Sequence, residues 1–314
     1  MVNRWHSQTK TTQKITPIVA TMNILTFDIE EWAIEMARIG GPRPHRMEEY
    51  DSLLGQVLDI LEERNILATF FCTGKMALEF PSVVKSIASK GHEIACHSFQ
   101  HTWCNKMNRH ELEEDTYAAI NAIEQCIGEK VKGYRAPAFS IGGNNTYAFE
   151  ILAKNGIEYD SSVFPAHRDF GGFPSFEYDI PTIIESNGIQ LHEFPIPMMN
   201  IIGKRIAYSG GGYFRLFPLF VVQHTMNSHS YSMLYFHMGD LVQEHKEMMT
   251  RDAYEKYFKE KGTLKRRLIR CLKSNISMGN ALDKLNTLIK RNDLINLSIA
   301  NETIVWKKQP SVKF

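Results

Sequence analysis

The sequence predicts an α/β fold built on a parallel sheet. Short apolar runs rich in β-branched and aromatic residues alternate with longer segments of helical period through the first half of the chain. The apolar runs are bounded by Gly, Pro or polar residues, as buried strands usually are. Alternation of this kind is typical of parallel strands joined by crossover helices.

Composition supports a globular protein and excludes several classes. Of the 314 residues, 43% are hydrophobic and 23% are charged, which are average values for a folded domain. The net charge of +1 gives no overall attraction to nucleic acid. No apolar stretch approaches the ~20 residues of a membrane span. Five cysteines without a CxxC pair argue against a disulfide framework or zinc knuckle, and they indicate a reducing compartment.

The first half of the chain contains five predicted strands and four predicted helices. The first strand, Asn23–Phe27, is apolar and ends in acidic residues. The other strands are expected at Leu67–Cys72, His92–Ala95 and Val131–Tyr134, with a fifth opening at Ile157–Tyr159. The helices are expected at Met47–Arg64, Pro81–Lys90, Asn108–Cys126 and Asn145–Lys154. Asn108 precedes Glu111 by three residues, the spacing of a capping box.

The second half is less regular. Residues Pro165–Tyr213 are rich in Gly, Pro and aromatics and are expected to form insertion loops, with a hairpin around residues 189–194. The elements expected after these loops are a helix at Leu216–Ser228, a strand at Met233–Phe236, helices at Asp252–Lys273 and Ala281–Lys290, and a final strand at Ile304–Trp306.

Polar residues follow the predicted strands, and in parallel α/β folds ligands bind beyond the carboxyl ends of the strands. These residues are expected to meet at one rim of the sheet. They are Asp28, Glu30 and Glu31 after the first strand, His97 and His101 after the third, Arg135 after the fourth, Asp160 after the fifth and His237 after the last apolar strand of the middle region.

The pair His97 and His101 indicates a metal site. Two imidazoles four residues apart point the same way if the segment turns helically, and with one carboxylate they form a three-ligand site for a divalent metal. The alternative is a chance spacing in a chain with 12 histidines.

The acidic cluster after the first strand supplies the carboxylate. Two neighbouring acids in different environments allow one to bind a metal and the other to act as a general base. The alternative is N-capping of a helix at Trp32–Ile39, where acidic residues are favoured by the helix dipole.

Arg135 and His237 each have a functional and a structural interpretation. Arg135 precedes Ala136-Pro137 at a strand end and would otherwise form a surface salt bridge. His237 is a candidate general acid near neutral pH, or else a histidine satisfied within the core.

Several motifs appear together in one order, namely TFDIEEW, ATFF, GHEIACHSFQH, YRAPAFS, YDSSVF and YFH. In order and approximate spacing they resemble the polysaccharide deacetylase family, the NodB-homology domain, over residues 23–240. SGGGYFRLFP at Ser209–Pro218, with FDIEEW, is similar to a subgroup linked to bacterial exopolysaccharide and cell-envelope glycan gene clusters.

The resemblance implies a distorted (β/α) barrel of about seven parallel strands. It also implies a divalent metal ion, zinc or alternatively cobalt, and removal of an acetyl group from an N-acetylated sugar. Carried over by position, the resemblance makes Asp28 the general base, held in place by Arg135. It makes Glu30, His97 and His101 the metal ligands and lets the N–H of Ala138 bind the oxyanion. His237 is then the general acid, and Asp160 orients His237. Glu31 is the alternative carboxylate ligand. Residues 22–240 would form the barrel and residues 241–314 a helical extension packed on it.

Three positions depart from the family pattern. Ile29 stands where many members have a second aspartate, which leaves Glu30 as the metal carboxylate. Phe164 replaces a frequent Trp, and Phe139 replaces a frequent Gly. The first departure bears on metal affinity and the other two on substrate choice.

The expected substrate is a glycan or a glycan precursor, with aromatic residues stacking on sugar faces. The candidates for stacking are Trp103, Phe139, Tyr213 and Phe214. Two other functions stay open, namely hydrolysis of another C–N bond in a cyclic imide or ureide, and an inactive glycan-binding module. Residues 1–21 are expected to be a poorly structured leader without signal-peptide features, which with the cysteine pattern favours a cytoplasmic protein peripheral to the membrane.

Overall fold

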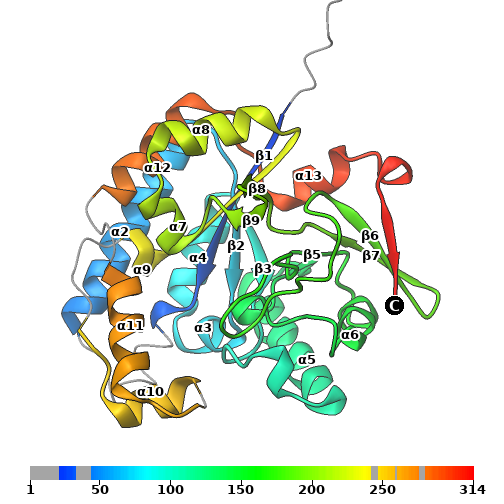
Figure 1. Cartoon of the computed structure of the whole chain (residues 1–314), viewed down its shortest axis with the longest axis horizontal. Helices are drawn as coiled ribbons and strands as arrows, with labels where there is room; N and C mark the ends of the chain where they lie inside the picture. Colours follow the sequence, from blue (N-terminus) through cyan, green and yellow to red (C-terminus); the bar gives the residue numbers. More distant parts are fainter. Residues whose placement is uncertain (1–20, 33–43, 242–246, 259, 276–279) are drawn as a thin grey trace, which may run out of the picture.

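The computed structural model describes residues 21–32, 44–241, 247–258, 260–275 and 280–314, with strands at the centre and helices around them (Figure 1). The expected leader at residues 1–21 lies almost wholly outside the described residues, as does most of the alternative helix at Trp32–Ile39. Within the described part, no helix is long and apolar enough to cross a lipid bilayer.

The main sheet has nine strands in the order β10-β1-β2-β3-β4-β5-β7-β6-β11. The seven strands from β10 to β7 in this order are parallel, β6 is antiparallel to β7, and β11 is parallel to β6. The predicted α/β fold with seven parallel strands is confirmed. Among the described residues no pairing joins β10 to β11, so the barrel is not closed by hydrogen bonds there.

The strands of the main sheet are β1 (Met22–Ile29), β2 (Thr69–Cys72), β3 (Glu93–Cys96), β4 (Gly133–Tyr134), β5 (Tyr159–Asp160), β6 (Thr182–Ser186), β7 (Ile189–Glu193), β10 (Tyr231–His237) and β11 (Ser311–Lys313). A separate hairpin consists of β8 (Met198–Ile201) and β9 (Lys204–Ala207).

The helices of the first half are α2 (Pro44–Glu63), α3 (Gly74–Glu79), α4 (Pro81–Ser89), α5 (Arg109–Ile127) and α6 (Tyr147–Lys154). Those of the second half are α7 (Gly211–Leu216), α8 (Leu219–Ser228), α9 (Met238–Leu241), α10 (Arg251–Phe258), α11 (Leu264–Asn275), α12 (Ala281–Arg291) and α13 (Leu297–Thr303). The predicted capping box of α5 is present, since Asn108 accepts from the N–H of Glu111 and the Glu111 carboxylate accepts from the N–H of Asn108.

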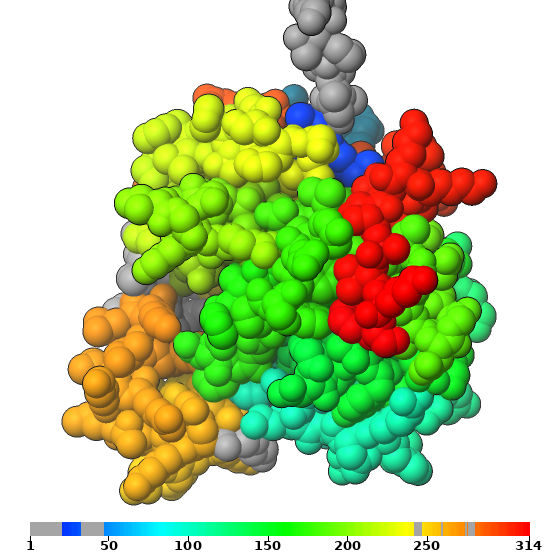
Figure 2. Space-filling view, turned by 45° about the vertical axis from the view of Figure 1, so that its right-hand side comes forward, coloured from blue at the N-terminus to red at the C-terminus, as the bar shows by residue number. Residues whose placement is uncertain are grey.

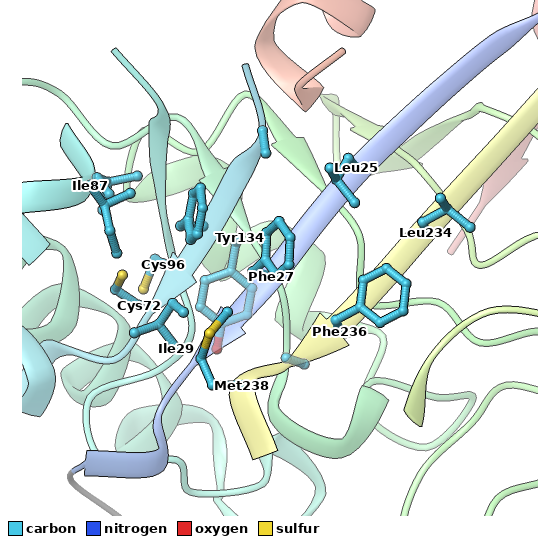
Figure 3. Packing of buried hydrophobic residues seen from close by; sticks show 14 of the residues in the cluster. Leu25, Phe27, Ile29, Cys72, Ile87, Cys96, Tyr134, Leu234, Phe236 and Met238 are labelled. Atoms are coloured by element: carbon cyan, nitrogen blue, oxygen red, sulfur yellow. The ribbon is translucent and has the colours of Figure 1, made fainter. Parts of the chain in front are cut away.

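Successive side chains of β1 point to opposite faces of the sheet, and the two faces have different environments. Leu25, Phe27 and Ile29 point into the main apolar core, where they pack with residues of the neighbouring strands and helices (Figure 3). Phe27 stacks on Phe70 of β2 with ring centroids 4.9 Å apart. Because side chains alternate along a strand, Asp28 must point to the opposite face. The apolar half of β1 therefore anchors the strand that carries the acidic residues.

Some predicted elements were wrong in extent or place. The segment Leu216–Ser228 holds the end of α7 and all of α8, separated at Pro218, and Asp252–Lys273 holds α10 and α11, separated around the buried Gly262. α3 and the β8–β9 hairpin were not predicted. Strand formation at Ile304–Trp306 is contradicted, because Trp306 starts a 3-10 turn and stacks on His192 with ring centroids 3.7 Å apart.

The C-terminal part of the chain also contributes strand pairings to the main sheet. β11 extends the main sheet beside β6, and Ile295 forms a bridge with Ile24 of β1. The border at residue 240 stays a prediction.

Candidate active site

Asp28 and Glu30 lie on one face at the end of β1 because they are two residues apart on an extended chain. Both side chains are buried, with 2% and 7% of their surface exposed. The register pairs Asp28 with His237 of β10, so the last residue of that strand lies beside the acids. The pairing of β1 with β10 thus brings together residues more than 200 positions apart.

Glu30, His97 and His101 form a cluster whose ligand atoms all lie within 4.8 Å of one another. Oε2 of Glu30 lies 3.3 Å from Nε2 of His97 and 2.6 Å from Nε2 of His101. Within the described residues this is the group of His, Cys, Asp and Glu side chains whose spacing suits a metal ion.

The cluster is suited to a cation because two of its buried polar atoms lack a well-aligned hydrogen-bond partner in the described part of the chain. Nε2 of His97 and Oε2 of Glu30 are buried and make no well-aligned hydrogen bond to a described residue. Nδ1 of His97 lies 2.7 Å from the carbonyl oxygen of Arg135, which fixes the ring and leaves Nε2 available as a ligand. Burial raises the pKa of Glu30, but His101 and His97 hold it well below its usual value overall. Two imidazoles and one carboxylate are the donor set of many catalytic zinc sites.

The two histidines converge through a loop and not through a helical turn. Residues 97–101 carry no helix, and Ser98 and His101 have φ values of 65° and 63°. The loop is held by α3 and α5, since the N–H of Gly74 donates to the Ser98 carbonyl and the N–H of Phe99 donates to Asp115. Left-handed backbone at non-glycine residues is unfavourable, so these contacts hold a strained loop in place.

Arg135 is fully buried and fixes Asp28. Its Nη1 donates to Oδ1 of Asp28 at 2.8 Å and to Oγ1 of Thr26 at 3.0 Å. The guanidinium also donates to Ser161 and lies 4.1 Å from the ring centroid of Phe71. This geometry contradicts the surface salt bridge considered above and agrees with a residue that positions the Asp28 carboxylate.

His237 faces the same carboxylates from β10. Its Nε2 lies 3.6 Å from Oδ2 of Asp28 and 3.8 Å from Oε1 of Glu30, and 34% of its side chain is exposed. Nδ1 lies 3.0 Å from Oδ2 of Asp240. Burial lowers the pKa of His237, but the Asp240 hydrogen bond and charge, with the charges of Glu30 and Asp28, raise it to about 10. The ring is therefore a protonated donor at neutral pH.

Asp240 takes the place that the resemblance gave to Asp160. The carboxyl of Asp160 instead accepts from Oγ of Ser162 at 2.6 Å and contacts Glu193. Oγ of Ser162 in turn accepts from the N–H of Ala136, so Asp160 supports the loop after β4. Sequence reasoning missed Asp240, although an acid three residues after His237, in the first turn of α9, was a usable signal.

Asp160 and Glu193 form a fully buried carboxyl pair. Burial raises the pKa of Asp160 to about 6, and burial with the nearby Asp160 charge raises the pKa of Glu193 well above its usual value. Burial therefore favours the protonated form of this pair. Oε1 of Glu193 also accepts from the N–H of Val163, which ties β7 to the segment after β5.

The Ala138 loop has an unusual backbone. Ala138 and Phe139 both have positive φ, 55° and 54°. Glycines face this loop closely, since a Cβ on Gly171 would lie 2.4 Å from the carbonyl oxygens of both residues, and the N–H of Gly172 donates to the Phe139 carbonyl. Strained backbone of this kind is typical of functional loops.

The aromatic candidates differ in exposure. Phe139 and Phe214 are buried, and their rings pack edge-on against Tyr235 and Phe236, so neither offers a free face to a sugar. Trp103 is also largely buried, against Phe170 and Phe258. Tyr213 on α7 is 37% exposed and is the candidate left available for stacking.

Glu31 lies outside the ligand cluster. Its Oε1 accepts from the N–H of Gly239 at 2.7 Å, which joins the end of β1 to α9. Burial raises the pKa of Glu31 to about 7, with His237 lowering it and Glu30 raising it further. This structural contact favours Glu30 as the metal ligand.

Comparison with known proteins finds two family matches along the chain. Residues 23–159 match the family described as polysaccharide deacetylase, and residues 161–291 match a domain of unknown function, DUF3473. Residues 23–159 are a polysaccharide deacetylase domain. The two matches meet at the end of β5, inside the continuous main sheet.

Curated relatives of this deacetylase domain match over part of their length. A bifunctional xylanase/deacetylase of Pseudobutyrivibrio xylanivorans is 38% identical over 96 residues, 30% of this chain and 16% of that protein. A chitooligosaccharide deacetylase of Rhizobium leguminosarum bv. trifolii is 32% identical over 100 residues, 31% of this chain and 43% of that protein. The matches thus cover less than half of each of these two relatives.

A solved structure supports the fold of the whole chain. A Mycobacterium smegmatis protein assigned as a polysaccharide deacetylase aligns with a TM-score of 0.63 at 19% identity, covering 94% of this chain and 93% of that one. Both matched regions of this chain are therefore covered by the fold of one solved α/β structure.

Proposed function

We propose that this protein is a metal-dependent hydrolase that removes an N-acetyl group from an amino sugar in a bacterial polysaccharide or its precursor. The observation that carries the proposal is one rim that holds a three-ligand cluster, an Arg-held carboxylate and a histidine held by Asp240. These are Glu30, His97 and His101, then Asp28, then His237. The neighbours of these groups support the roles proposed for them.

The metal would be held by Glu30, His97 and His101 and is proposed to be zinc, with cobalt as the alternative. When bound, such an ion polarises a carbonyl oxygen and lowers the pKa of a water. Asp28, oriented by Arg135, accepts the proton of the attacking water. His237 donates a proton to the departing amine nitrogen, which is a poor leaving group as an anion. The backbone of Ala138 is proposed to stabilise the oxyanion, a contribution of ~2.7–4 kcal/mol for one donor.

A cavity beside the Ala138 loop gives room for more than one sugar. Its volume is about 550 Å³, and polar and aromatic residues line it, among them Trp103, Asn105, Lys106, Asn144, Arg168 and Phe258. Its lining includes Trp103, two residues after His101, but none of the three proposed ligands. We propose that it accommodates neighbouring units of an exopolysaccharide or cell-envelope glycan, and that the protein acts in the cytoplasm, peripheral to the membrane.

Hydrolysis of a cyclic imide or ureide uses similar groups and is the second candidate. An inactive glycan-binding module is disfavoured by the fixed orientation of Arg135, Asp28 and His237, since sugar binding alone does not require this arrangement.

The direct test is acetate release by the zinc-loaded protein from N-acetylated oligosaccharides, nucleotide-linked sugars and lipid-linked glycans, with detection of the new amine. We expect acetate and free amine in equal amounts from at least one class. Activity on a cyclic imide or ureide with no acetate release would favour the second candidate. Glycan binding by a protein that releases nothing would favour the binding module.

A further inference from the structure

Helix α11 combines a strong positive charge with exposed leucines. Its sequence, LKRRLIRCLKSN, contains five basic residues and no acidic residue. Its apolar side chains are exposed to an unusual degree, with 63% for Leu264, 49% for Leu268, 42% for Ile269 and 59% for Leu272. Isolated exposed leucines are ordinary, but four on one helix form an apolar surface that calls for an explanation.

The spacing places these side chains together. Leu264, Leu268 and Leu272 are four residues apart in succession and therefore lie along one face of the helix. Ile269 extends this face beside Leu268 and Leu272. We call these four residues the apolar face of α11.

The opposite side of α11 packs on the protein. The guanidinium of Arg270 lies 4.7 Å from the ring centroid of Phe170 and 4.5 Å from that of Phe258, and Nη1 of Arg267 donates to the carbonyl of Met249. These two arginines fix the rotation of the helix. The apolar face consequently points outward, although an ordinary surface helix turns its apolar side inward.

Basic residues lie on and beside the outward face, since Lys265 stands on it four residues before Ile269, and Arg266 and Lys273 border it. Lys265, Arg266 and Lys273 are exposed. Arg266 pairs with Glu260 and Lys273 with Asp169, but exposed pairs are weak and are readily exchanged for other anions. A basic amphipathic helix with leucines on its apolar side is the pattern of an interfacial membrane helix.

We propose that α11 rests on an anionic lipid bilayer, with the apolar face at the acyl boundary and the lysines and Arg266 among the headgroups. Charge complementarity favours lipid, since Lys265, Arg266 and Lys273 are exposed and the helix carries no acidic residue. Basic residues near an anionic membrane add electrostatic attraction that falls off within a Debye length.

Docking through α11 would bring the rim of the candidate site near the membrane. α10 and α11 stand out together beside the carboxyl ends of the strands (Figure 1), and the space-filling view shows them as a separate lobe, in orange (Figure 2). On α10, Phe258 contacts Trp103 and the ring of Tyr257 stacks over His101 with centroids 6.4 Å apart. The inference adds an interaction surface to the proposed function, and lipid binding is measurable without any substrate.

The test is flotation of the full chain with vesicles of phosphatidylcholine alone or mixed with phosphatidylglycerol. We expect binding to the mixed vesicles, weak binding to the neutral ones, and a loss of binding at high salt. The double variant Leu268→Ser/Leu272→Ser should bind about tenfold less or weaker still, and Lys265→Glu should show a smaller loss. Leu78→Ser on α3 is the matched control, because Leu78 is 57% exposed outside α11, and it should bind as the wild type.

Circular dichroism and release of acetate from a small oligosaccharide should be unchanged in the double variant, which separates docking from catalysis. Equal flotation of the wild type and the double variant would overturn the proposal. A wild-type dimer that the double variant converts to a monomer, with no flotation of either protein, would assign the apolar face to a second copy of the chain and also overturn it.

Discussion

Nδ1 of His237 lies 3.0 Å from Oδ2 of Asp240, and the backbone N–H of His237 donates to the same oxygen at 3.1 Å. Asp240 thus fixes the ring through Nδ1, while Nε2 on the opposite side of the ring faces Asp28. A positioned carboxylate on one ring nitrogen selects the tautomer and stabilises the protonated ring.

Replacement of Asp240 by Asn should lower the pKa of His237. The pKa is raised to about 10 in the wild type, with Asp240 as the main raising contribution. The acid form of His237 is present below its pKa, so kcat/KM should fall as the pH rises through that value. In Asp240→Asn this alkaline limb should move down toward the usual value of about 6.5.

Asp160→Asn is the control for this experiment. If Asp240 is the partner of His237, Asp160→Asn leaves the alkaline limb where it is, whatever its effect on stability. A shift of the limb in Asp160→Asn, with none in Asp240→Asn, would restore the assignment implied by the resemblance.

Removal of a ligand should empty the metal site. His101→Ala and Glu30→Gln each delete one of three donors, and we expect metal affinity to fall by at least about 100-fold, since even supporting residues are worth 10–100-fold. Elemental analysis after dialysis measures this loss. Glu31→Gln is the matched control and should retain the metal, because Glu31 is engaged with Gly239. Full occupancy in Glu30→Gln together with loss in Glu31→Gln would exchange their roles.

Asp28→Asn should keep the metal and lose activity. Asp28 is outside the ligand cluster and its carboxylate is held by Arg135. Loss of a general base typically costs ~10²–10⁴ in rate. Metal content and kcat should be measured on the same preparation, and a variant with near wild-type kcat would exclude Asp28 as the base.

His237→Ala should slow hydrolysis most for substrates whose leaving group must be protonated as it departs. An amide requires protonation of its nitrogen, whereas an activated ester does not. The variant should therefore retain more of its wild-type rate on the ester. Equal losses on both substrates would indicate a positioning or binding role for His237.

Glu193→Gln should make stability less dependent on pH. Glu193 and Asp160 have pKa values raised by burial, so the folded state binds more protons than the unfolded state once the pH exceeds the usual carboxyl values of about 4. Stability then decreases as the pH rises from about 4 toward the folded pKa values, which are about 6 for Asp160 and raised well above the usual value for Glu193. As the pH rises from about 4 to about 7, Tm should decline less in Glu193→Gln than in the wild type.

The control for that measurement is Glu185→Gln on β6, where the glutamate is paired with Lys313 near the surface. Its Tm should follow the wild-type profile. The same decline in Glu193→Gln and the wild type would exclude the carboxyl pair as its origin.

The sequence by itself determined the local features of this protein. Apolar period and capping residues predicted the α/β alternation, because both act within one element. The two-residue spacing of Asp28 and Glu30, at the end of an apolar strand, placed both acids on one face. The separation of His97 and His101 by four residues identified a candidate ligand pair.

Only the tertiary structure decided which residues meet across elements. His97 and His101 converge through a left-handed loop held by α3 and α5, which helical spacing does not predict. Asp240, and not Asp160, lies beside His237, because the short α9 places Asp240 against the end of β10. Phe139 and Phe214 are buried. The leucines of α11 are exposed, because Arg267 and Arg270 fix the rotation of that helix. These outcomes depend on contacts between residues far apart in the chain, and a linear pattern encodes periodicity but not which neighbour covers each face.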